Sequence, residues 1–137
     1  MTAHEFTKRV MELADIQEKE VAEKAIQIVF SILRHRLTEE EASDVKSQLP
    51  HELKRVWDNH VWITNFFKLS GRKLKYHHVN ELLTLVENEI LRENLPLSAD
   101  NITKAVIHTL KEQISFGETK DVIAILPDEL KDYYRAA

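Results

Sequence analysis

Apolar residues recur every three or four positions through most of this chain, which is the spacing of one face of an α-helix. The longest stripe consists of Val21, Ala25, Ile28 and Ile32 together with Val29 and Leu33. A second strong stripe opens the later half of the chain at Val79, Leu82, Val86 and Ile90. Only two glycines and three prolines occur among the 137 residues. Because residues that break helices are so scarce, the pattern predicts an all-α protein.

The chain contains an internal repeat. Residues 22–57 align with residues 99–134 at a constant offset of 77, with 11 identities over 36 positions and no gap. Weaker similarity extends the match upstream at an offset of 76, so the two units span residues 5–57 and 81–134, joined by a connector of residues 58–80. Equal apolar positions at equal spacing should bury equal faces. We therefore predict two tandem, pseudo-symmetric helical units that pack as one compact bundle, with the whole chain a single domain.

The most specific part of the repeat is the phrase L-P-x-E-L-K. Its structural positions are Leu49, Pro50 and Leu53 in the first unit and Leu126, Pro127 and Leu130 in the second. Proline cannot lie inside a helix, but its fixed φ suits the first turn of a new one. The phrase therefore predicts that one helix ends and another begins, with all four leucines facing the core.

Two acidic pairs recur at aligned positions, Glu41 with Asp44 and Glu118 with Asp121. Carboxylates three residues apart share a helix face, where they could hold a divalent cation or act as acid and base. However, Thr38 and Ser115 each precede the glutamate by three residues, which is the spacing of a capping box. Because capping already accounts for the spacing, we interpret the pairs as structural.

These features together resemble a known family. Each unit has a first helix of the F-x3-V type, a long apolar helix, a short capped helix with E-x2-D-V and a closing LP-x-E-L, a pattern similar to the bacterial family called domain of unknown function 2267. The likeness covers nearly the whole chain. The first copy departs from the commoner G-E form, because Glu40 stands where the second copy has Gly117. The resemblance implies a small helical protein without an established activity, and it supplies no catalytic residues.

Composition narrows the functional classes. Charged residues make up 31% of the chain and hydrophobic residues 43%, with a net charge of −4, which is typical of a globular protein. The chain has no cysteine, which excludes disulfides and thiolate chemistry. The N-terminal stretch MTAHEFTKRVMEL has no apolar signal region, and no apolar run approaches the roughly 18 residues of a membrane span. We expect a cytoplasmic protein without a membrane span.

The usual chemical motifs are missing from the sequence. None of the seven histidines stands three or four residues from another, so one helix cannot supply two imidazole ligands. Two glycines cannot build the loops that cradle nucleotide phosphates. We therefore expect no catalytic residues, no metal site and no cofactor, and we predict that the protein is not an enzyme.

The connector has an unusual composition. Residues 59–80 contain four cations and no acidic residue, and several aromatic side chains lie among them. The candidate residues for binding an anionic ligand are Lys68, Arg72, Lys73, Lys75 and Trp62, because cations interleaved with aromatic rings can follow a phosphate backbone and stack on bases. A competing interpretation is that Trp62, Phe66 and Leu69, at i, i+4 and i+7, form a short helix that seals the two units together while the cations stay in water.

Two functions follow as expectations. The first is a non-enzymatic protein-interaction or scaffold module with an unidentified protein partner, or one that associates with itself, because the repeated positions are those that helix breaks and packing require. The alternative is a binder of nucleic acid or another anionic ligand through the connector, residues 59–80.

Overall fold

The computed structural model describes residues 1–72 and 74–137, and these residues form nine α-helices and no strands. In chain order the helices are α1 (Ala3–Ala14), α2 (Lys19–Arg36), α3 (Glu39–Ser47), α4 (His51–Asp58), α5 (Trp62–Leu69), α6 (Val79–Arg92), α7 (Ala99–Gln113), α8 (Phe116–Ala124) and α9 (Asp128–Ala136). The prediction of an all-α protein is confirmed. Within the described residues, no helix combines the length and the apolar character that crossing a bilayer requires.

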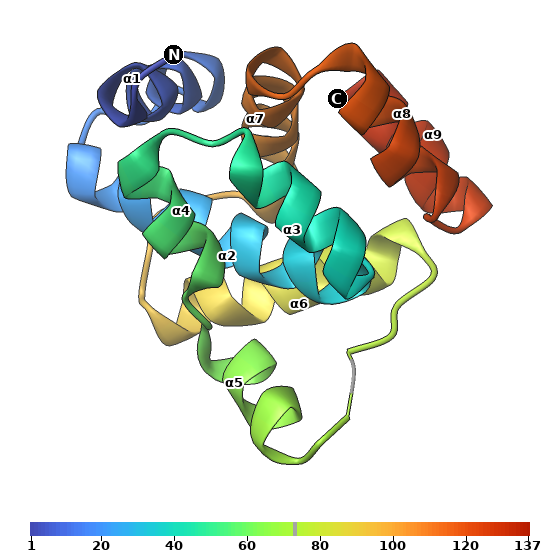
Figure 1. Ribbon diagram of the computed structural model, residues 1–137. Coiled ribbons are helices and arrows are strands. Elements are labelled where there is room, and N and C mark those ends of the chain that lie inside the picture. The colour runs from blue at the N-terminus through green and yellow to red at the C-terminus, as the bar shows by residue number, and fades with distance from the viewer. Residues whose placement is uncertain (73) are drawn as a thin grey trace.

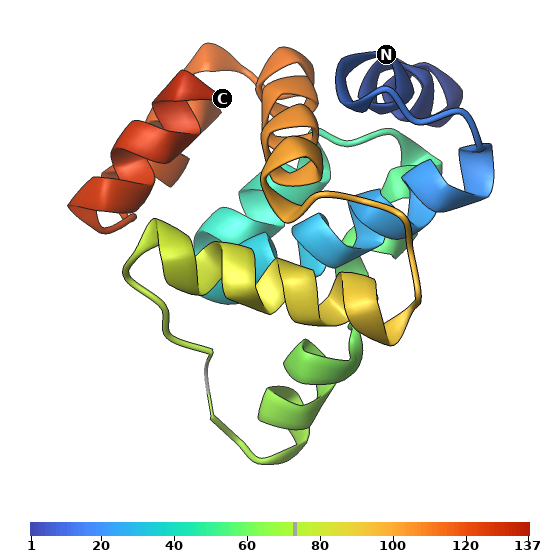
Figure 2. The ribbon, with the colours of Figure 1, turned by 180° about the vertical axis from the view of Figure 1, so that it is seen from behind.

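The longest helix, α2, lies at the centre of the bundle. It packs against α1, α4, α6 and α7 (Figures 1 and 2). Phe30 of α2 is fully buried and makes edge-to-face contacts with Phe6 and Trp57, at centroid distances of 5.6 and 5.2 Å. These contacts join α1, α2 and α4 through one aromatic cluster, whereas α5 lies below the other helices in both views.

The repeated phrase starts a helix in each half of the chain. Pro50 and Pro127 occupy the N-cap positions of α4 and α9, with φ angles of −55° and −59°. The two prolines thus stand one position before the first helical turn that the sequence predicted for them. The leucines of the phrase, Leu49, Leu53, Leu126 and Leu130, are all buried. The predicted helix break and the predicted core positions are confirmed.

The helices also correspond in order between the two aligned halves of the chain. Helix α1 packs on α2 as α6 packs on α7, α1 packs on α7 as α6 packs on α2, and α3 packs on α8. A two-fold relation between the halves would produce this pairing of contacts. The pseudo-symmetry itself stays a prediction, which superposition of residues 5–57 on residues 81–134 tests.

Candidate binding surface on the connector

Helix α5 is held against the bundle by polar contacts. The hydroxyls of Ser31 in α2 and Thr64 in α5 are both fully buried and form a hydrogen bond of 2.5 Å. The carboxylate of Glu89 in α6, also buried, accepts a hydrogen bond of 3.0 Å from the backbone N–H of Ile63. Buried polar groups need partners, so these contacts fix which face of α5 turns inward.

That orientation turns the apolar stripe of α5 to solvent. Trp62 is 53% exposed, Phe66 51% and Leu69 79%. The interpretation that this stripe seals the two units together is therefore wrong, although the predicted helix is present. The physical reason is that the face of α5 turned toward α2 and α6 carries Thr64, which pairs with Ser31, so the stripe on another side of the helix is left in solvent.

The exposed rings form one ordered surface. Trp62 and Phe66 are stacked, with 5.7 Å between their centroids and an interplanar angle of 12°. The guanidinium carbon of Arg92, from α6, lies 3.9 Å from the centroid of the Trp62 ring. A guanidinium at this distance from an indole makes a favourable cation–π contact. The rings are therefore held in place while they remain open to solvent. We call Trp62, Phe66 and Leu69 the aromatic face of α5.

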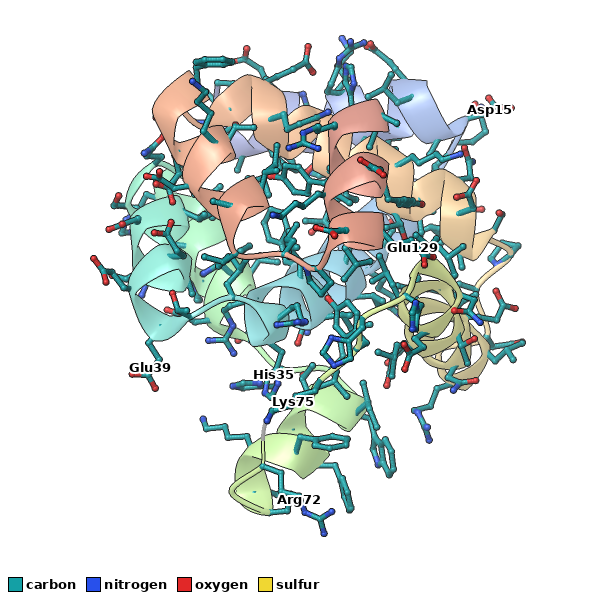
Figure 3. The ribbon with its side chains drawn as sticks, turned by 90° about the vertical axis from the view of Figure 1, so that its right-hand side faces the viewer. Asp15, His35, Glu39, Arg72, Lys75 and Glu129 are labelled. Carbon is teal, nitrogen blue, oxygen red and sulfur yellow. The ribbon has the colours of Figure 1, made fainter. Side chains whose placement is uncertain are left out.

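The predicted cations of the connector divide between two neighbouring cavities. Lys68 and Arg72 line a cavity of about 380 Å³, whereas Lys75 lines a cavity of about 290 Å³. His35 lies on both cavities. Figure 3 shows His35 and Lys75 between α5 and the helices above it, with Arg72 at the lower end of α5. Lys73, the remaining candidate, lies outside the described residues.

The larger of these two cavities, which we call the basic pocket, is dominated by nitrogen-bearing side chains. Arg34, His35, His60, Lys68 and Arg72 line it, together with the single carboxylate of Glu39. Arg34 Nη2 lies 2.9 Å from Nε2 and 3.1 Å from Nδ1 of the His60 ring. Arg34 Nε is buried and has no hydrogen-bond partner among the residues that the structure describes. The pocket is therefore lined by several cations and one carboxylate, and one of those cations, Arg34, has incomplete hydrogen bonding.

Electrostatics keep one member of the basic pocket uncharged. Burial, followed by the nearby charges of Arg34 and Lys68, lowers the pKa of His60 to about 4. The imidazole is thus neutral at physiological pH and can accept or donate through its ring nitrogens. Burial also lowers the pKa of Arg34, although a guanidinium stays protonated in proteins.

Sequence reasoning missed Arg34, His35 and His60. It assigned the binding residues to the connector alone and considered the histidines only as metal ligands on a single helix. The connector packs back on the end of α2, where the hydroxyl of Tyr76 donates to the carbonyl of Ile32 over 3.0 Å and the backbone N–H of Leu74 donates to His35 Nδ1 over 3.2 Å. The run Arg34-His35-Arg36 at a helix end beside a basic connector is the signal that could have suggested the pocket.

The repeated glutamates behave differently from the capping boxes that the sequence predicted. The hydroxyls of Thr38 and Ser115 accept the expected hydrogen bonds from the backbone N–H groups of Glu41 and Glu118. The backbone N–H of Ser115, however, donates to the side chain of Gln48, so the return bond predicted for Glu118 is wrong. Helices α3 and α8 pack together, so Gln48 reaches the start of α8 and the carboxyl groups of Glu41 and Glu118 lie close to each other.

This acidic contact strongly perturbs one carboxyl group. Glu118 is 6% exposed, and burial together with the adjoining Glu41 carboxyl raises its pKa to about 7. Oxygens of Glu41, Glu118 and Asp121 lie within 4.8 Å of one another, a spacing at which a divalent cation could bind. A proton shared between Glu41 and Glu118 satisfies the same geometry, because two adjoining carboxyl groups cannot both ionise cheaply.

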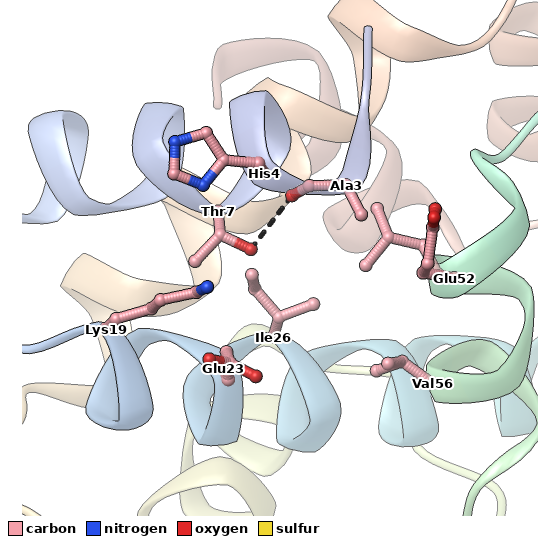
Figure 4. A pocket seen from close by; sticks show the side chains of 9 residues that line it. Ala3, His4, Thr7, Lys19, Glu23, Ile26, Glu52 and Val56 are labelled. Atoms are coloured by element: carbon pink, nitrogen blue, oxygen red, sulfur yellow. Dashed lines mark hydrogen bonds between the residues drawn. The ribbon is translucent and has the colours of Figure 1, made fainter.

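A third cavity lies between α1, α2 and α4. Its volume is about 380 Å³, and Ile26 and Leu53 are among the residues that line it. Figure 4 shows the labelled side chains around it, with Thr7 donating a hydrogen bond to the carbonyl of Ala3 and Glu52 on the opposite side. Charged groups of both signs surround this cavity, so it lacks the single sign of the basic pocket.

Comparison with known proteins identifies the chain at the level of a family. A search of curated proteins finds no match. The family model for DUF2267, described as an uncharacterized conserved protein, matches residues 3–133. The resemblance drawn from the repeated LP-x-E-L phrase is therefore confirmed, and this chain belongs to the DUF2267 family.

Proposed function

We propose that this protein is a non-enzymatic interaction module that docks an acidic segment of a partner protein on the aromatic face of α5. The observation that carries the proposal is the outward orientation of Trp62, Phe66 and Leu69, all more than half exposed. Contiguous apolar groups on a protein surface mark interaction sites, and tryptophan is enriched among the residues that dominate binding energy.

The spacing and charge of this surface indicate the partner. Side chains at i, i+4 and i+7 form a strip that matches the apolar stripe of an amphipathic helix. Residues 59–80 carry four cations and no carboxylate, so complementary charge on the partner is negative. A second copy of this chain would bring like charges together, which makes self-association less favourable than an acidic partner.

The remaining elements of the proposal are consistent with a binding module. The repeated positions Leu49, Leu53, Leu126 and Leu130 are buried, so they serve packing rather than chemistry. The cytoplasmic location predicted from the sequence stays a prediction.

The test is affinity capture with matched variants. The immobilised wild-type protein should retain a partner that the double variant Trp62→Ser with Phe66→Ser does not. Phe116→Ser is the control, because Phe116 is 77% exposed on α8 and its loss should leave capture unchanged. Cross-linking and mass spectrometry of the captured protein should locate the contact in a segment rich in Asp and Glu.

Three results would contradict the proposal. The double variant could retain the same proteins as the wild type. Light scattering could show a dimer that the double variant loses, which would assign the face to a second copy. A single-stranded oligonucleotide could bind the wild type and not the double variant, which would favour nucleic acid instead.

A further inference from the structure

We infer that the basic pocket between the end of α2 and the connector binds a phosphate monoester group, with Arg34 and Lys68 as its principal contacts. This site is separate from the aromatic face of α5. It needs no protein partner, so its failure and the failure of the docking proposal can be told apart.

The first argument is the charge balance of the pocket. Arg34, Lys68 and Arg72 are cations, and Glu39 is the one carboxylate among the residues that line it. His60 adds an imidazole ring whose nitrogens can donate or accept hydrogen bonds. Cations gathered in a concave, partly buried site focus positive potential and attract an anion.

The second argument is the incomplete bonding of Arg34. Its Nε is buried and has no partner among the described residues, and Nη2 is directed at the neutral ring of His60. A buried polar group without a partner needs an explanation in a native protein, and one explanation is a missing ligand. The planar guanidinium presents parallel N–H donors, which match two oxygens of a phosphate.

The aligned position in the second half of the chain supports this reasoning. Lys111 corresponds to Arg34 in the repeat, and its ammonium donates to the backbone carbonyls of Tyr134 and Arg135, over 2.9 and 3.1 Å. In that copy the cation serves as a cap for α9. The contacts with α9 therefore explain the position of the Lys111 ammonium, whereas the Nε–H of Arg34 has no partner among the described residues.

The size of the pocket limits the ligand. A cavity of about 380 Å³ lies near the lower end of the range for small-molecule sites, which is roughly 300 to 1,000 Å³. A phosphate together with the group that carries it fits this space better than a bare ion. A compact tetrahedral dianion also suits these two cations. The planar guanidinium of Arg34 can donate two parallel hydrogen bonds, and the ammonium of Lys68 can add a compact positive charge beside it.

The experiment is titration with inorganic phosphate, followed by calorimetry and by backbone chemical shifts in NMR. Wild-type protein should bind phosphate, with the largest shifts at residues around Arg34, His60 and Gly71. Lys68→Gln and Arg34→Met should each weaken binding by about tenfold or more, since each removes a charge-assisted contact. Arg34→Lys should bind phosphate more tightly than Arg34→Met but less tightly than the wild type, because lysine keeps the charge and lacks the paired N–H donors of the guanidinium.

Lys75→Gln is the matched control. It removes the same charge from the same connector, but Lys75 lines the neighbouring cavity rather than this one. Its affinity for phosphate should stay close to that of the wild type. If Arg34→Met fails to fold, Lys68→Gln and Arg72→Gln decide the question, because both side chains are exposed.

Two results would overturn the inference. One is the absence of heat and of localised shifts at millimolar phosphate. The other is an equal loss of affinity in Lys75→Gln and Lys68→Gln, which would show only general attraction between charges. Phosphoserine and ribose 5-phosphate, titrated in parallel, would tell a phosphorylated side chain from a sugar phosphate as the natural source. The double variant at Trp62 and Phe66 should bind phosphate normally.

Discussion

Arg34 and Lys111 occupy aligned positions in the two halves of the chain, yet their side chains meet different surroundings. Lys111 donates to two carbonyls at the end of α9. Arg34 lies against the ring of His60, and within the described part of the chain its buried Nε has no partner. The leucines of the repeated phrase show the opposite behaviour, because all four are buried alike. Positions that agree between the copies hold the fold together, and positions that differ are where a binding site can arise.

The largest expected effect tests the positions that agree. Leu53→Ala and Leu130→Ala should each lower the free energy of unfolding by about 2 to 5 kcal/mol, which is the range for truncating a buried leucine. Leu53 lines the cavity between α1, α2 and α4, and water can enter an open space more easily than a closed one. Its truncation should therefore cost less than that of Leu130. Urea unfolding of both variants measures the difference.

Leu69→Ala is the control for the leucine comparison. Leu69 is 79% exposed, so its truncation should change the free energy of unfolding by no more than about 0.5 kcal/mol. A loss below about 1 kcal/mol at both Leu53 and Leu130, well under the range for buried leucine, would mean that the repeated phrase does not serve packing.

The helices themselves could be predicted from the sequence, but the rotation of α5 could not. Apolar spacing and proline positions depend on neighbouring residues in the chain, so they locate helix breaks such as that before His51. The buried side of α5 depends instead on a hydrogen bond between Thr64 and Ser31, 33 residues apart. Hydrophobicity alone favours burying Trp62, but the face of α5 that meets the bundle carries Thr64, and Trp62 stays 53% exposed.

The candidate sites were partly predictable for the same reason. Lys68 and Arg72 stood out because they belong to a stretch without acidic residues. Arg34 and His60 join them only because the connector folds back on α2, a contact that no local pattern encodes. Glu41 and Glu118 were recognised as a repeated pair, but the packing of α3 on α8 decides that they face each other.

The next largest expected effect is on the pH dependence of stability, and it concerns the aligned residues Glu41 and Glu118. Burial and repulsion from Glu41, Asp44 and Asp121 raise the pKa of Glu118 to about 7, above the ordinary value of 4.5 in an unfolded chain. Burial beside Glu118 also raises the pKa of the Tyr134 hydroxyl in α9. A group whose pKa rises on folding adds stability below its unfolded value, and this contribution is lost as pH rises from 4.5 to about 7.

Glu118→Gln should remove this pH dependence. At pH 8 with EDTA present, the variant should exceed the wild type in free energy of unfolding by about 1 to 3 kcal/mol, because the amide carries no charge and can donate to Glu41. The advantage should shrink at pH 5, where Glu118 is protonated. Chemical denaturation at both pH values provides the measurement, with the exposed Glu40→Gln as a control that should show no difference. A variant less stable than the wild type at both pH values would exclude a shared proton.

The smallest expected effect separates Glu52 from Glu129, which stand at aligned positions of the repeated phrase. Glu129 Oε1 accepts a hydrogen bond of 2.8 Å from the backbone N–H of Val79, and Oε2 lies 3.1 Å from His78 Nδ1. It therefore satisfies a donor at the start of α6, and this contact lowers its pKa. Glu52 lies beside the cavity shown in Figure 4.

Glu129→Gln should lower the melting temperature, by less than either leucine truncation, because an amide oxygen is a weaker acceptor at a helix N-terminus than a carboxylate. Glu52→Gln should leave the melting temperature unchanged. The lowered pKa of Glu129 predicts that the gap between wild type and Glu129→Gln closes as pH falls below 4.5, where the carboxylate becomes protonated. Thermal melts of both variants at pH 7 and pH 3 measure this gap. Equal losses in the two variants would mean that the aligned glutamates contribute equally to stability, and the contrast between the copies would then not extend to the repeated phrase.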